Sequence, residues 1–127
     1  MKNPDTRRYV ATHEWVKTED AHTVRVGITE YAQDQLGDIV YVDLPEVGQR
    51  FAAGEVCVVI ESVKAASDIH MPISGEISAV NTVLDEHPEL INEDPFGQGW
   101  LFQIHPDNGD DINGLLTPQE YDDLLDI

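Results

Sequence analysis

A chain of 127 residues is long enough to bury a hydrophobic core without metal or disulfide cross-links, and its single cysteine excludes an intramolecular disulfide. Seven lysines and arginines stand against 25 aspartates and glutamates, a formal net charge of -18, which argues against nucleic-acid or membrane binding and suits partner proteins with basic surfaces. No apolar run approaches the roughly 20 residues of a membrane helix, and the start MKNPDTRRYV has no apolar signal segment, so we expect a soluble, cytoplasmic protein, or a mitochondrial matrix protein in a eukaryote.

The first third of the chain predicts a β-hairpin followed by a short helix. Residues 14–17 and 23–28 alternate between apolar and polar side chains around a polar turn, which is typical of a hairpin. Residues 29–37 (TEYAQDQLG) are typical of a helix, since Thr29 can cap its start and Gly37 can end it.

The rest of the chain predicts short strands and one more helix. The expected strands are 38–44, 56–62, 66–71, 76–80 and 100–104, and residues 85–99 are expected to form a loop. Thr117, Pro118 and Glu120 have the spacing of a capping box, which predicts a C-terminal helix over about 117–126. We therefore expect a single domain spanning 1–127, mainly β and folded as a sandwich with a helix near each end.

Lys64, one of three lysines, lies in the segment VIESVKAASDIHMP. Because the strand-like runs 56–62 and 66–71 are separated by only three residues, we expect a tight hairpin over about 56–71 with Lys64 at its tip. Such a side chain extends into water without neighbours, and its amine is a poor nucleophile on its own. This argues against a Schiff-base lysine. An amine that another enzyme acylates and an ordinary exposed turn lysine both fit.

Several sequence blocks resemble the H proteins of the glycine cleavage system. ESVKAASDIHMPISG is similar to the family's lipoyl-attachment segment, and further blocks match in the family's order: HEW, VGITEYAQDQLGDIVYVDLPEVG, NTVL, PELIN, GW and LLTPQEY. The resemblance extends from about Tyr9 to Leu125. It implies a barrel-sandwich hybrid of the lipoyl- and biotinyl-carrier type, with a short helix after the first hairpin and a helix at the C-terminus.

The resemblance also implies a carrier rather than an enzyme. Lys64 would carry lipoate through an amide bond, attached by a lipoate ligase or lipoyl transferase. The arm would take an aminomethyl group from glycine decarboxylase, present it to the aminomethyltransferase, and be reoxidised by dihydrolipoamide dehydrogenase. A tethered arm supplies a high effective concentration to each of these partners. We expect a monomer, because a carrier must expose its arm to several enzymes.

Four further residues match family positions with a functional role. Glu61 and Gly75 match positions linked with recognition by lipoate-attaching enzymes, although Gly75 also fits a simple turn glycine. Glu14 matches a glutamate that lines the cleft in which the aminated arm is held, and Asp68 matches a carboxylate that helps there. A solvated surface acid is the alternative for Glu14 and Asp68.

Other classes of protein fit the residues less well. A biotin carrier would show Met-Lys-Met, from which Val63 and Ala65 depart on both sides of Lys64. A lipoyl domain of the 2-oxoacid dehydrogenases would more usually show Asp-Lys-Ala and would lack the HEW region and the C-terminal capped helix. An H-like lipoate relay, an unmodified acidic interaction domain and a hydrolase with an exposed carboxylate pair stay open. The five histidines show no metal-ligand spacing, so we expect no metal site; they are His13, His22, His70, His87 and His105.

Overall fold

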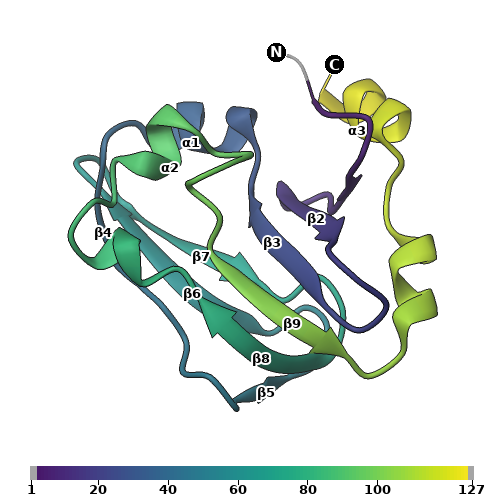
Figure 1. Cartoon of the computed structure of the whole chain (residues 1–127). Helices are drawn as coiled ribbons and strands as arrows, with labels where there is room; N and C mark the ends of the chain where they lie inside the picture. Colours follow the sequence, from purple (N-terminus) through teal and green to yellow (C-terminus); the bar gives the residue numbers. More distant parts are fainter. Residues whose placement is uncertain (1–2, 126–127) are drawn as a thin grey trace.

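The computed structural model describes residues 3–125 and shows two antiparallel sheets with short helical segments around them (Figure 1). In order across the larger sheet, the strands are β1 (Arg8–Tyr9), β2 (Glu14–Thr18), β3 (Val24–Ile28), β9 (Phe102–Pro106), β8 (Gly75–Val80) and β5 (Arg50–Phe51). In order across the smaller sheet they are β4 (Ile39–Asp43), β6 (Val56–Ser62) and β7 (Ala66–His70). The helical segments are α1 (Glu30–Leu36), η1 (Thr82–Asp85), α2 (Leu90–Glu93), η2 (Gly109–Gly114) and α3 (Pro118–Leu125).

The predicted N-terminal hairpin and helix are confirmed. Strands β2 and β3 pair with Trp15 opposite Gly27, and a Cβ on Gly27 would lie 2.5 Å from Trp15 Cζ2, so the glycine leaves room for the indole. Thr29 Oγ1 accepts a hydrogen bond from Ala32 N at 3.3 Å. Helix α1 ends at Gly37, whose φ of 77° is a conformation that favours glycine.

The predicted hairpin around Lys64 is also confirmed. Strands β6 and β7 pair directly, with Ile60 opposite Ser67 and Glu61 opposite Ala66. Strand β4 pairs with the other side of β6, so β4 and β7 are the two edges of the smaller sheet. The first residue of β4, Ile39, pairs with Ser62 at the end of β6, and only Gly37 and Asp38 separate β4 from α1, so the C-terminal end of α1 lies close to the hairpin tip.

Three predictions differ from the structure. The segment 85–99, predicted as a loop, contains the single helical turn α2, which buries Ile91 but is too short to show a sequence period. The last strand starts at Phe102 rather than Trp100, because Trp100 N donates to Gly97 O at 3.2 Å within a turn. The short elements β1, β5, η1 and η2 were not predicted.

The C-terminal capping box is confirmed, and the predicted end of its helix at Asp126 lies outside the described residues. Thr117 Oγ1 accepts from Glu120 N at 3.2 Å, and Glu120 Oε1 accepts from Thr117 N at 2.9 Å. Helix α3 packs beside β1, and α1 packs against α2 (Figure 1). Within 3–125, no helix is both long and apolar enough to cross a membrane.

The hydrophobic core has two parts. The main part lies between the sheets and buries side chains such as Val26, Ile60, Ile77 and Phe102. A separate aromatic cluster of Tyr9, Trp15 and Tyr121 attaches α3 to β1 and β2. The mainly β, two-sheet architecture with a helix near each end is the predicted fold class.

Candidate functional site

The tip of the β6–β7 hairpin is closed by the side chain of Ser62. Its hydroxyl oxygen accepts from the backbone N–H groups of Lys64 and Ala65, both at 3.2 Å, and Ser62 N donates to Ala65 O at 2.9 Å. A serine that binds the backbone two and three residues ahead stabilises a tight turn. The turn leaves the Lys64 side chain outside the sheet and exposed.

The sequence predicted that the Lys64 side chain extends into water without neighbours. In the structure its stem instead lies over the C-terminal end of α1. A Cβ built on Gly37 would lie 3.1 Å from Lys64 Cε and 3.5 Å from Nζ, so the glycine leaves space for the stem. The C-terminal end of a helix carries partial negative charge, which favours a nearby ammonium group. No ion pair or side-chain hydrogen bond involves Lys64 Nζ within the described part of the chain.

Asn92 of α2 forms hydrogen bonds with the junction between α1 and β4, over which the Lys64 stem lies. Its amide nitrogen donates to Gly37 O at 2.9 Å, and its side-chain oxygen accepts from Ile39 N at 3.0 Å. The hairpin tip is attached to the same junction, since Val63 N donates to Asp38 O at 3.0 Å. Reasoning from residue types did not single out Asn92, because its partners lie more than 50 residues earlier in the chain.

A cleft of about 270 Å³ opens beside the lysine stem. Its walls are α1, β7 and the turn before β2, and its lining residues are Thr12, His13, Tyr31, Ala32, Gln35, Leu36, Ser67, Asp68 and Ile69. Lys64 itself does not line the cleft, but Leu36 in its wall directly precedes Gly37, over which the Lys64 stem lies. The predicted site residue Asp68 is exposed in its wall.

Glu14, predicted to line this cleft, lies buried behind its wall. Its carboxylate accepts from the hydroxyl of Thr12, which does line the cleft, and from His70 N at 3.1 Å. Burial raises the pKa of the Glu14 carboxyl, and the bonds from Thr12 and His70 oppose that shift. Glu14 therefore does not line the cleft itself and contacts it only through Thr12.

His13 forms part of the cleft wall in an unusual backbone conformation. Its φ of 76° lies in the left-handed region, which is uncommon for residues other than glycine. Its Nδ1 is 2.7 Å from the hydroxyl of Tyr121 in α3, and that hydroxyl is 2.7 Å from Thr29 Oγ1 at the start of α1. Burial lowers the pKa of His13, which favours the neutral ring. Sequence reasoning missed this network because His13 and Tyr121 are 108 residues apart.

The two predicted recognition residues occupy different places. Glu61 is exposed near the hairpin tip, directly opposite Tyr41 and Ala66. Gly75 lies in the larger sheet, where a Cβ would be 2.5 Å from the backbone oxygen of His105. The fold therefore requires glycine at 75 for packing and places it in the sheet that does not carry the Lys64 hairpin.

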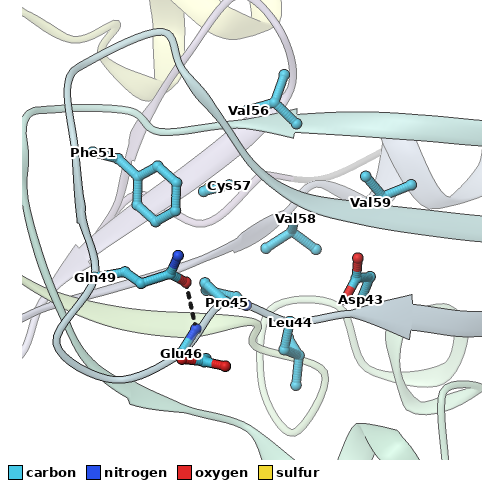
Figure 2. Close-up of a pocket in the computed structure, with 10 residues that line it drawn as sticks. All are labelled: Asp43, Leu44, Pro45, Glu46, Gln49, Phe51, Val56, Cys57, Val58 and Val59. Carbon is cyan, nitrogen blue, oxygen red and sulfur yellow. Dashed lines mark hydrogen bonds between the residues drawn. The ribbon is translucent and has the colours of Figure 1, made fainter.

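A second, larger cleft lies at the far end of β6 from Lys64 and has a volume of about 390 Å³ (Figure 2). Cys57 in its wall is buried, donates weakly to Ile69 O at 3.6 Å, and has a pKa raised by burial to about 12. A thiol with such a pKa is a poor nucleophile and metal ligand. Among residues 3–125, no group of three or more His, Cys, Asp or Glu side chains is placed to hold a metal ion.

An exposed lysine at the tip of a tight hairpin, on two packed antiparallel sheets, is the arrangement expected of a carrier protein of the lipoyl and biotinyl type. Residues 7–126 match the family model described as glycine cleavage H-protein. The H protein of Psychrobacter sp. (strain PRwf-1) is 53% identical over 93% of this chain and 94% of its own length. The H protein of Alkalilimnicola ehrlichii is 50% identical over 96% of this chain and 94% of its own length.

The fold leads to the same family. A crystal structure of a glycine cleavage system H protein from Mycobacterium marinum superimposes with a TM-score of 0.88 at 42% identity, covering 98% of this chain and all of that one. The chain belongs to the glycine cleavage H-protein family, which confirms the resemblance read from its sequence blocks.

Proposed function

We propose that this protein is the lipoyl-bearing carrier of a glycine cleavage system and that Lys64 is its attachment site. The observation that carries the proposal is an exposed amine without a bonding partner among the described residues, at a hairpin tip and beside a cleft. The amine suits attachment: Nζ bonds to the carboxyl carbon of an activated lipoyl donor, which loses its leaving group while Nζ loses a proton. Once bound, lipoate supplies a dithiolane that accepts an aminomethyl group and a dithiol that is reoxidised.

The chain's own residues hold the arm and exclude it from water. The walls formed by α1 and β7 supply apolar surface through Ala32, Leu36 and Ile69. Asp68 in the wall and the buried Glu14 behind Thr12 add negative charge, which would retain the cationic amine of a loaded arm. These roles make the protein a carrier without a catalytic residue.

Its expected partners are glycine decarboxylase, the aminomethyltransferase, dihydrolipoamide dehydrogenase and a lipoate ligase or transferase. The strongly acidic composition supports docking to basic surfaces of such enzymes. The curated relatives named above are bacterial, which favours the cytoplasm as the compartment.

Intact mass spectrometry tests the attachment site. Protein expressed with lipoate in lipoylation-competent cells should gain one lipoyl-sized increment. Lys64→Arg, which keeps the charge, should lose the increment, and the matched control Lys17→Arg should keep it. An increment that persists in Lys64→Arg would refute this assignment.

Reconstitution tests the carrier role. The lipoylated protein, combined with the three partner enzymes, should support glycine-dependent bicarbonate exchange. A lipoylated protein that is inactive in this assay but passes its lipoyl group to other proteins would instead be a lipoate relay.

A further inference from the structure

The outer face of the smaller sheet presents two large apolar side chains to solvent next to each other. Ile39 pairs with Ser62 but Tyr41 pairs with Glu61, so the register shifts and Val40 is an extra residue in β4. Such a bulge re-aims side chains that would otherwise alternate between the two faces. Val40 and Tyr41 are accordingly 54% and 52% exposed, although they are consecutive in one strand.

This apolar surface adjoins Lys64. Val63, which directly precedes the lysine, is 67% exposed, and its backbone N–H binds Asp38 O, close to the start of β4. Glu61 lies directly opposite Tyr41 across the strand pair. We call this surface the bulge patch: Val40, Tyr41 and Val63 form its apolar centre, and Asp38 and Glu61, both exposed, form its acidic border.

The bulge patch is separate from the cleft that would hold the arm. The strand order β4-β6-β7 puts β4 at one edge of the smaller sheet and β7, which lines the cleft, at the other. None of the five patch residues lines the cleft. Adjacent exposed apolar side chains with a polar border are typical of a protein-binding surface.

We propose that the bulge patch is the docking surface of the enzyme that acylates Lys64. This inference rests on the proposed function, in which Lys64 is acylated. Before acylation the amine extends only as far as the lysine side chain, so the acylating active site must cover the hairpin tip and the surface around it. Enzymes that act later reach the end of a longer arm and do not need this face.

The partner's chemistry follows from the patch. Its apolar centre fits an apolar depression, and its carboxylates fit lysine or arginine side chains around that depression. The net charge of -18 adds a long-range attraction to such a basic surface. This attraction predicts that added salt lowers kcat/KM for acylation of the unchanged protein.

The test measures lipoylation of the purified apo protein by a lipoate ligase with ATP and lipoate, followed by intact mass. Val40→Ser/Tyr41→Ser should raise KM for the apo protein about tenfold to a hundredfold with little change in kcat. The matched control, Val47→Ser/Val83→Ser, removes two valines that are similarly exposed elsewhere and should behave as the unchanged protein. Tyr41→Phe keeps the ring and should also stay close to it.

A second readout separates docking from folding. After prolonged reaction has lipoylated it fully, the Val40→Ser/Tyr41→Ser protein should be reduced by NADH through dihydrolipoamide dehydrogenase at the normal rate. An unchanged KM for the patch variant, or an equal rise in the control variant, overturns the docking surface while leaving the proposed function intact. Failure of the unchanged protein to be lipoylated at all overturns the proposed function and the docking surface with it.

Discussion

Removing the Tyr121 hydroxyl tests whether helix α3 supports the wall of the cleft. That hydroxyl bridges His13 Nδ1 and Thr29 Oγ1, at 2.7 Å from each, and so connects α3 with the cleft wall and with the start of α1. Tyr121→Phe deletes the bridge but keeps the ring, which stacks on Tyr9 with centroids 4.7 Å apart. The variant therefore isolates the polar contribution from the packing.

The expected cost follows from the burial of the two partners. Thr29 is fully buried, and its hydroxyl contacts only Tyr121 Oη and Ala32 N among the described residues, so the loss of Tyr121 leaves a buried hydroxyl short of one hydrogen-bond partner. Such a group costs about 1–3 kcal/mol. His13 is only partly buried, so water can replace its lost partner at little cost. We expect a loss of about 2 kcal/mol, which lowers Tm by roughly 8 °C in a chain of this size.

Urea unfolding and calorimetry of Tyr121→Phe would measure this loss, with Tyr41→Phe as the control. Tyr41 is exposed, so removal of its hydroxyl should change stability by less than about 0.5 kcal/mol. In the lipoylated protein, Tyr121→Phe should also release a bound aminomethyl group faster, because His13 loses its anchor. A Tyr121→Phe protein as stable as the control would refute the bridge as a support of the wall.

Three other substitutions or probes have defined outcomes. Gly37→Ala should cost about 1–2 kcal/mol by urea unfolding, because φ is 77° there and the new methyl group meets the Lys64 stem; an unchanged midpoint would contradict this. Because burial raises the pKa of Glu14, its protonated carboxyl contributes stability at low pH, and this contribution is lost as pH rises from about 4.3 through the folded-state pKa. Glu14→Gln should therefore gain stability relative to the unchanged protein over that range. The free energy of unfolding measured against pH tests this, and the same pH dependence in both proteins would exclude the effect. Native Cys57 should resist Ellman's reagent until urea unfolds the chain, and rapid native labelling would show that its thiol is accessible.

Elements with local stop and start signals were predicted closely. Thr29 and Gly37 bound α1, Thr117 and Glu120 cap α3, and the strands on either side of Lys64 end within one residue of their predicted limits. Caps and tight turns are made by residues a few positions apart, so the sequence contains their full description. Helix α2 and the bulge at Val40 were not predictable in this way, because each exists only against a packed or paired neighbour.

The candidate site likewise has features that nearby residues determine and features that depend on distant segments. Lys64 could be placed at an exposed turn from its neighbours alone, and sequence blocks in order were enough to suggest the family. The burial of Glu14 behind Thr12, the contact of His13 with Tyr121 and the packing demand on Gly75 all come from segments distant in the chain. Burial and long-range contacts depend on how the two sheets close on each other, so only the tertiary structure decided which side chains form the cleft and which stand behind it.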